Sequence, residues 1–279
     1  MRKRIVLLLT YTFITTITIS MYRVVYNLYL REIGFSNTLI GSVTSAQLWG
    51  SAIIGLLAAI LADTVGKKKI LFLSAIVVPV SGIALAFVVD PTFILVLSFI
   101  KGGFTVTAFT VVMATMTSIT KTGNRAKVFG LNFGINMASG VIGNFIGGAF
   151  GDLFGLQTTL IISMVAHLPA IIPVIKLEMT ESRSRLKELF NFSGLQPDQR
   201  KVLTYYFIST ATVGFGAGLF IHFGNLIFKD LFNMSATGIG IALSIAQLGT
   251  AAGSTLSHKL GKRFGALKFN LTMQLLVIP

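Results

Sequence analysis

Long, continuous apolar segments make up most of this sequence of 279 residues. Charged residues divide the chain into runs of about 20 residues, the length that a helix needs to cross a bilayer. The runs lack the regular apolar and polar alternation of a transmembrane barrel, so they predict helices. We place eight spans and the first residues of a ninth at 5–29, 38–62, 70–89, 92–118, 128–150, 156–176, 202–228, 237–257 and 269–279.

Composition supports this interpretation, because 53% of the residues are apolar and only 11% are charged. A water-soluble domain carries roughly 25% charged residues, so we expect the outer surface of this chain to face the lipid bilayer. The predicted fold class is an all-α membrane protein. The sequence has no cysteine, its spans hold no deep Asp or Glu, and His167, His222 and His258 lack a metal-ligand spacing. We therefore expect no enzyme activity, no metal and no cofactor.

Basic residues fall on one side of the predicted spans. The sequence holds 23 Lys and Arg against 9 Asp and Glu, which gives a net charge of +14. With a cytoplasmic N-terminus, 19 of the 23 basic residues lie in cytoplasmic segments, and such segments resist translocation. The pattern predicts a multi-pass protein of the plasma (inner) membrane. It excludes nucleic acid as a partner, because short basic clusters between spans form no solvated basic face.

The longest hydrophilic stretch divides the chain into two parts. We expect an N-terminal six-helix bundle at 1–176, a cytoplasmic linker at 177–201, and a partial C-terminal bundle at 202–279 with spans seven, eight and the start of nine. Within the linker, Leu186, Leu189 and Phe190 share one face of a possible helix on the inner membrane surface. An ordinary basic linker explains the same residues equally well.

An internal repeat relates the two parts. Both copies cross the membrane in the same direction, as expected for parallel halves related by an axis along the membrane normal. The matching pairs are Asn27-Leu28 with Asn225-Leu226, Gly41 with Gly240, Ala46-Gln47-Leu48 with Ala246-Gln247-Leu248, and Gly66-Lys67-Lys68 with Gly261-Lys262-Arg263.

The loop between the second and third spans resembles the most specific signature of the major facilitator superfamily of secondary transporters, G-x-L-A-D-R-x-G-R-K. The matching text runs from Ala59 to Lys68, with Ala59 in place of the first glycine and Thr64 in place of the arginine. The residues that match are Asp63, Gly66, Lys67 and Lys68. The resemblance implies a conformational switch, in which Asp63 stabilises the outward-facing state near the N-terminus of the eleventh helix.

Two further spans resemble patterns of the same family. The fifth span has a glycine-rich pattern that includes Gly143, Gly147 and Gly148, where small residues let helices pack closely. Asn144 stands where drug-proton antiporters have proline, and Lys101 stands at the glutamine of a fourth-span pattern whose arginine is missing. A complete member has twelve spans, so the resemblance implies a complete N-terminal half plus a partial C-terminal half. The chain is expected to be truncated after about eight and a half spans.

Polar side chains inside the spans are the candidates for a substrate cavity. A charged side chain there costs roughly 2.5 to 3.5 kcal/mol on insertion, and Lys101 lies too deep to reach the interface easily. Arg23 lies near the outer end of its span, where extension to the headgroups is an equal alternative. In the family that the chain resembles, the first, fourth, seventh and tenth spans line the central cavity, which implies the set Arg23, Asn27, Lys101, His222 and Asn225. Weaker candidates are Asn132, Asn136, Gln47 and Gln247.

The predicted function is secondary active transport of a small solute by alternating access. Basic cavity candidates without buried acids favour an anionic or zwitterionic solute, and a coupling proton or counter-solute stays open. One alternative is a truncated, non-transporting membrane protein that acts as a sensor or binds a partner. Another is a drug efflux antiporter, if the absent spans supply the acids.

Overall fold

A computed structural model gives the structure of residues 2–178 and 197–264. The chain in these two ranges is helical with short turns and contains no strand. Its elements are α1 (Arg2–Glu32), α2 (Asn37–Val65), α3 (Lys67–Ala84), α4 (Pro91–Ile119), η1 (Thr122–Asn124), α5 (Arg125–Phe154), α6 (Leu156–Val165), η2 (Leu168–Ala170), α7 (Ile171–Ile175), α9 (Pro197–Phe220), η3 (Ile221–Phe223), α10 (Gly224–Phe232) and α11 (Ala236–Phe264).

Six helical stretches in the described ranges are long and apolar enough to cross a membrane. They coincide with six of the eight predicted spans. They are Arg2–Glu32, Asn37–Ala62, Pro91–Ile119, Thr122–Phe154, Leu156–Ile175 and Ala236–Ser254. The third predicted span corresponds to α3, which begins with three lysines, and the seventh to α9, η3 and α10.

Two of the spans are broken helices. In the sixth, η2 separates α6 from α7 and contains Pro169, a residue that cannot donate a helix hydrogen bond. In the seventh, η3 separates α9 from α10 at His222, without a proline. By contrast, Pro79 lies inside α3. The two breaks place backbone carbonyl groups and polar side chains in the interior of the bundle, where they reach neighbouring helices.

Turns between the helices are short and have clear local causes. Asp90 caps α4, because its carboxylate accepts hydrogen bonds from the N–H groups of Thr92 at 2.9 Å and Phe93 at 3.1 Å. Gly66 separates α2 from α3 at a φ of 120°, and Gly155 separates α5 from α6 at 83°. Both angles suit glycine, which has no Cβ.

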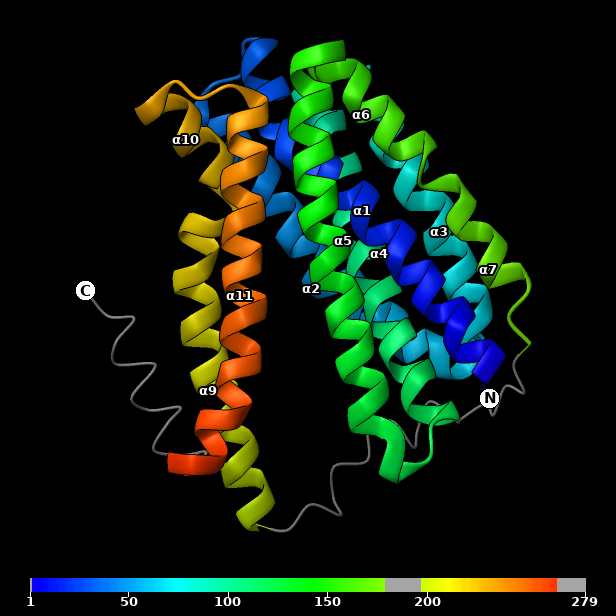
Figure 1. The fold of residues 1–279 in the computed structure, drawn as a ribbon. Coiled ribbons are helices and arrows are strands. Elements are labelled where there is room, and N and C mark those ends of the chain that lie inside the picture. Colours follow the sequence, from blue (N-terminus) through cyan, green and yellow to red (C-terminus); the bar gives the residue numbers. More distant parts are fainter. Residues whose placement is uncertain (1, 179–196, 265–279) are drawn as a thin grey trace.

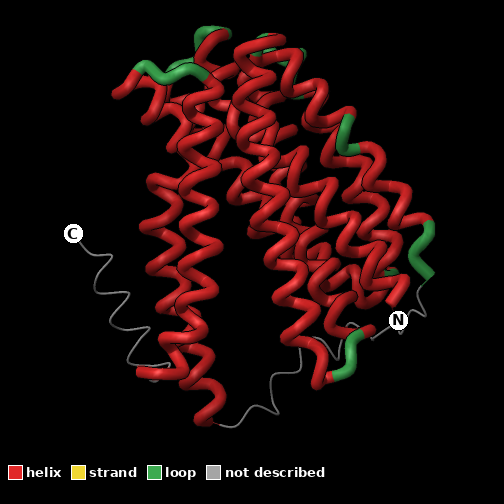
Figure 2. The backbone as a smooth tube through the Cα atoms, viewed as in Figure 1, coloured by secondary structure: helices red, strands yellow, loops and turns green. Residues whose placement is uncertain are grey.

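The helices form two groups. In the first, α1 packs against α5 and α6, while α4 packs against α2 and α3. The second group contains α9, α10 and α11; it meets the first where α11 packs against α5 and α10 against α1. Figure 1 shows α5 and α11 in contact at the top of the view and diverging towards the end that carries the N-terminus. Figure 2 shows how few residues lie in loops.

Apolar side chains cover much of the outer surface. Trp49 is 65% exposed, Leu56 64% and Phe93 64%, each on a long helix. Such a surface is unfavourable in water and suits lipid. The chain is therefore a multi-pass helical membrane protein.

Some predicted boundaries differ from the structure. The helix α3 ends at Ala84, five residues before the predicted end of the third span, because the chain turns back towards Asp90, the cap of α4. The helix α9 begins at Pro197, inside the predicted linker 177–201. The proposed surface helix in that linker and the ninth span at 269–279 lie outside the described residues. The division into two bundles and a linker stays a prediction.

Candidate functional site

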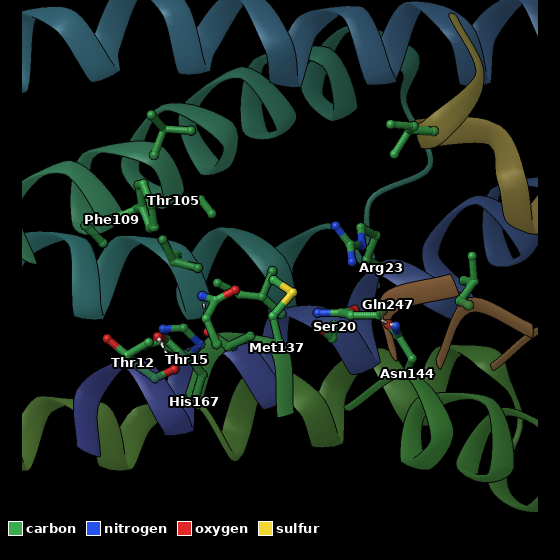
Figure 3. Close-up of a pocket in the computed structure, with 18 of the residues that line it drawn as sticks. Thr12, Thr15, Ser20, Arg23, Thr105, Phe109, Met137, Asn144, His167 and Gln247 are labelled. Atoms are coloured by element: carbon green, nitrogen blue, oxygen red, sulfur yellow. Dashed lines mark hydrogen bonds between the residues drawn. The ribbon is translucent and has the colours of Figure 1, made fainter. Parts of the chain in front are cut away.

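A cavity of about 590 Å³ lies between the two groups of helices. Its volume is typical of sites for small molecules, which measure roughly 300 to 1,000 Å³. One wall comes from α1, α4 and α5, and the other from η3, α10 and α11. Figure 3 shows these side chains around the cavity. A site that uses both groups changes shape when the groups move relative to each other.

One face of α1 supplies a polar stripe to the cavity. Thr12, Thr16, Ser20 and Arg23 recur every three or four residues, the spacing that places side chains on one face of a helix. Thr12 donates to Asn132 Oδ1 at 3.0 Å, and Thr16 accepts from Asn136 Nδ2 at 3.1 Å. These bonds fix α1 against α5 while the cavity keeps its polar lining.

Arg23, a predicted cavity residue, lines the cavity and is exposed there. No Asp or Glu belongs to the described lining, and Arg23 is its sole Lys or Arg. A guanidinium group offers five N–H donors in a planar fork that matches carboxylate and phosphate groups. The cavity therefore presents an unneutralised positive charge to a solute.

The predicted residues Asn225 and His222 also line the cavity, whereas Asn27 does not belong to its lining. Asn27 instead donates to Asn225 Oδ1 at 3.1 Å and to the carbonyl group of His222 at 2.9 Å. It thus contacts His222, where the seventh span breaks, and Asn225 in the first turn of α10. Asn27 therefore stabilises two residues of the cavity wall without lining the cavity itself.

Lys101, the remaining predicted cavity residue, points elsewhere. Its side chain is only 6% exposed, and its ammonium group lies 3.8 Å from the centroid of the Tyr22 ring. It is buried within the first group of helices, and it does not belong to the cavity lining. Thr105 and Phe109, further along α4, line the cavity instead. The cation–π contact partly replaces the water that the ammonium group loses on burial.

His167 lines the cavity, although the sequence did not select it as a site residue. It directly precedes η2 and is 1% exposed. Its Nδ1 atom lies 2.8 Å from Thr18 Oγ1, while its Nε2 atom is buried without a hydrogen-bond partner. The sequence signal that could have identified this residue was a titratable side chain two residues before Pro169 in an apolar span.

Close contacts between α5 and α11 join the two groups. Gly148 lies against Ala236 and Gly240, whose Cα atom would be 3.1 Å from a Cβ at position 148. Asn144 Nδ2 donates to Gln247 Oε1 at 3.0 Å. The other two glycines named from the sequence, Gly143 and Gly147, face α1. All three glycines therefore lie where a larger residue would separate helices.

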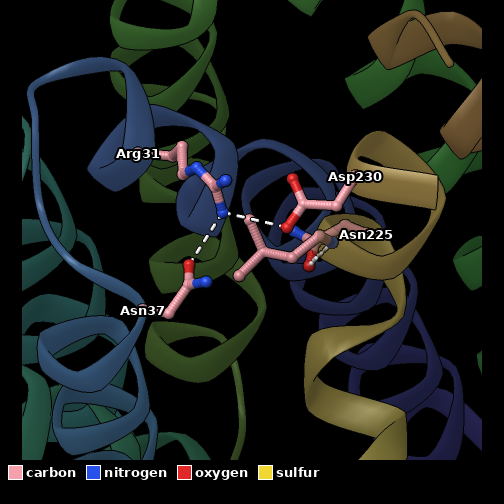
Figure 4. Close-up of polar contacts among 5 residues, drawn as sticks. Arg31, Asn37, Asn225 and Asp230 are labelled. Carbon is pink, nitrogen blue, oxygen red and sulfur yellow. Dashed lines mark hydrogen bonds and ion pairs between the residues drawn. The ribbon is translucent and has the colours of Figure 1, made fainter. Parts of the chain in front are cut away.

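Charged residues hold the two groups together near the end of α1. Arg31 pairs with Asp230 at 3.0 Å, as Figure 4 shows, and both side chains are partly exposed. Asp152, at the end of α5, accepts hydrogen bonds from the N–H groups of Ala236 at 3.0 Å and Thr237 at 2.8 Å. A carboxylate at a helix N-terminus also interacts favourably with the helix dipole. The last turn of α5 therefore caps α11.

The predicted switch loop joins α2 and α3. Gly66 provides the turn, and Lys68 Nζ donates to the carbonyl group of Ile175 at 2.8 Å. Lys67 begins α3. The side chain of Asp63 lies outside the described residues, so its proposed contact with a further helix stays a prediction. In the described ranges, no three His, Asp or Glu side chains are close enough to hold a metal ion.

Many secondary transporters place their substrate sites at the interface of two related groups of helices, and the cavity of this chain lies between two groups of helices. The sequence matches the family model of the Major Facilitator Superfamily over residues 8–278. The chain belongs to this family. A comparison with curated proteins finds no match.

Three solved structures share this fold. A bacterial homologue of the human lysosomal transporter Spinster, inward-facing and unoccupied, aligns with a TM-score of 0.69 at 15% identity, over 94% of this chain and 62% of that one. The nucleoside transporter NupG aligns at 0.73 and 15% identity, over 95% and 69%. A D-xylose-proton symporter aligns at 0.63 and 14% identity, over 93% and 68%. The chain thus spans less than two thirds of the Spinster homologue.

Proposed function

We propose that this protein is a secondary transporter that moves a small anionic solute across the membrane by alternating access. The observation that carries the proposal is Arg23, the single Lys or Arg on the described lining of a cavity that no Asp or Glu lines. A cation on the wall of a protein cavity attracts an anion more strongly than it does in bulk water, because the surrounding protein has a lower dielectric constant. Family membership supports transport as the activity.

We further propose the orientation that the basic loops predict, with the N-terminus in the cytoplasm. In that orientation, the contacts made by Arg31 and Asp152 join the two groups at the outer side of the membrane. The helices α5 and α11 diverge towards the cytoplasmic end (Figure 1). The structure would then represent an inward-facing state, the state named for the Spinster homologue. A proton is a reasonable coupling ion, because one structural neighbour is a proton symporter.

The test is uptake of radiolabelled solutes by the full-length protein in proteoliposomes. The solute panel contains carboxylates, phosphorylated compounds, zwitterions and neutral sugars, each with and without a pH gradient. Arg23→Gln is expected to lower uptake of the transported anion at least tenfold. Lys229→Gln removes a positive charge from an exposed position of α10 outside the cavity and is the matched control. Its uptake should stay within twofold of wild type.

Two results would contradict the proposal. The first is wild-type uptake of anions by Arg23→Gln. The second is a full-length protein that is correctly folded in proteoliposomes and takes up none of the solutes, which would favour the sensor or partner-binding alternative.

A further inference from the structure

We propose that the solute is a hydroxylated anion of the sugar-acid class, whose anionic group binds Arg23 and whose hydroxyl group donates a hydrogen bond to Nε2 of His167. This inference rests on the proposed function and specifies its substrate class. It assigns His167 as a residue that determines specificity. Three observations support it: the hydrogen bonds of Thr18, which bear on the proton position of His167, the unpaired atoms of cavity-lining residues, and the spacing along α1 between Thr18 and Arg23.

The first observation concerns which nitrogen atom of His167 carries a proton. The hydroxyl group of Thr18 has one hydrogen atom and lies 3.0 Å from the carbonyl oxygen of Ile14 and 3.1 Å from that of Thr15. A threonine inside a helix donates to such a carbonyl group. Towards His167, at 2.8 Å, the Thr18 oxygen then acts as the acceptor. We therefore assign the proton to Nδ1, which leaves Nε2 with a free lone pair.

The second observation concerns unpaired polar atoms. Six buried side-chain N or O atoms in the described ranges lack a hydrogen-bond partner, and three of them belong to cavity-lining residues. These three are His167 Nε2, Asn144 Oδ1 and the hydroxyl group of Tyr11. A buried polar atom without a partner costs about 1 to 3 kcal/mol. A ligand that supplies hydrogen-bond donors would give these atoms the partners that they lack.

A hydroxyl group fits this site better than an ammonium group. Both donate to an acceptor such as Nε2, but an ammonium group would bring a second positive charge into the cavity that Arg23 lines. No described lining residue is acidic, so that charge would remain unneutralised. The donor on the solute is therefore neutral, while the charged group is the anion at Arg23.

The third observation concerns the length of the solute. His167 contacts α1 at Thr18, and Arg23 follows five residues later on the same helix. At a rise of about 1.5 Å per residue, the two positions lie roughly 7.5 Å apart along the axis. A chain of five or six carbons spans such a distance. The cavity volume of about 590 Å³ accommodates a solute of this size.

The test measures binding to the full-length protein in detergent by isothermal titration calorimetry, with three probes of similar size. D-Gluconate carries a carboxylate and hydroxyl groups, hexanoate carries only the carboxylate, and D-glucose carries only hydroxyl groups. Wild type is expected to bind gluconate at least tenfold more tightly than hexanoate, because a site with buried acceptors rejects an analogue that lacks the donor. Glucose should bind at least tenfold more weakly than gluconate.

Two substitutions at the same position separate the ends of the imidazole ring. His167→Asn keeps an N–H donor near the Nδ1 position for Thr18 but has no atom at the Nε2 position. We expect it to bind gluconate and hexanoate within threefold of each other, with unchanged hexanoate affinity. His167→Gln keeps a polar group near the Nε2 position and should retain most of the preference. If His167→Asn unfolds, Thr18→Val releases the ring and should reduce the preference instead.

The outcomes separate the two proposals. If His167→Asn or Thr18→Val shows the wild-type ratio of gluconate to hexanoate affinity, the role of His167 is overturned. If wild type binds both carboxylates equally and Arg23→Gln loses both, the hydroxyl contact is wrong while the anion site stands. If Arg23→Gln binds both carboxylates as wild type does, the proposed anion site fails.

Discussion

Asn27 on α1 and Asn225 on α10 form a hydrogen bond to each other, with 3.1 Å between Asn27 Nδ2 and Asn225 Oδ1. Each also donates at 2.9 Å to the main-chain carbonyl group three residues before the other, Asn27 to His222 and Asn225 to Val24. The two residues are equivalent positions of the sequence repeat. Their reciprocal bonds are what a pseudo-twofold axis between the two groups produces.

This pair joins the two groups beside the cavity. Asn225 is 4% exposed and Asn27 is 8% exposed, so water competes little for their amide groups. The carbonyl group of His222 loses its regular helical environment at η3, and Asn27 supplies a donor to it. The repeat thus stabilises the break of the seventh span with a residue of the first.

Alanine at either asparagine should destabilise the protein. We expect Asn27→Ala and Asn225→Ala each to lower the free energy of unfolding by about 1 kcal/mol, because buried amide bonds between membrane helices are of this order. The double variant should lose less than the two single losses added together, since the residues share one bond. Unfolding experiments in mixed micelles measure the free energy of unfolding of the two single variants and the double variant. Asn124→Ala, at a position without a side-chain cap bond, is the control. Full additivity would contradict the coupling.

Gly148 should not tolerate a larger residue. A Cβ at this position would collide with the carbonyl oxygen of Ala236, so Gly148→Ala must separate α5 from α11. Overpacking of this kind costs about 1 to 3 kcal/mol. Gly134→Ala on the same helix has nothing within 4 Å and should be neutral or stabilising by up to about 1 kcal/mol. Thermal unfolding of both variants checks the prediction, and equal stability of the two would refute it.

Loss of the Asp152 carboxylate should loosen the end of the cavity near the end of α1. Asp152→Ala removes two hydrogen bonds and a favourable charge from the start of α11, which costs about 0.5 to 2 kcal/mol. The sequence contains no cysteine, so a single Thr16→Cys reports access to the cavity. We expect faster labelling by an impermeant maleimide that is added on the side where α1 ends.

Asp90→Ala is the matched control for Asp152→Ala. Asp90 also caps a helix through two N–H groups, but it caps α4 within the first group. It should lower stability similarly without changing the labelling rate of Thr16→Cys. Equal acceleration by both variants would mean that general loosening, rather than the contact between the groups, opens the cavity.

The sequence predicted the positions of the spans because apolar length is a local property. It also contained the cause of the break in the sixth span, Pro169, whereas the break at His222 has no proline to mark it. The role of His167 depends on Thr18, which lies 149 residues away in the sequence. A contact of that kind follows from packing, which a pattern along one helix does not encode.

The sequence also could not predict the direction in which a side chain points. Both Arg23 and Lys101 were selected because they are charged residues inside predicted spans, yet only Arg23 lines the cavity. Helix α4 is apolar on most sides, so its sequence does not indicate which face meets α1 and which meets the cavity. Asp152 lies in the short segment between the fifth and sixth predicted spans, and its contact with α11 follows only when the two groups are placed together.

The environment of Lys101 leads to a final prediction. Its ammonium group lies over the Tyr22 ring, and its Cε atom would be 3.3 Å from a Cβ at Gly82, so it is enclosed by α1 and α3. Lys101→Met keeps the length of the side chain and removes the buried charge, so it should fold stably and retain the solute preference of wild type. Tyr22→Leu removes the cation–π contact of the buried Lys101 ammonium group. It should lower the free energy of unfolding by about 2 kcal/mol or more. Unfolding and solute-competition measurements on both variants test this, and a changed solute preference in Lys101→Met would place Lys101 at the solute after all.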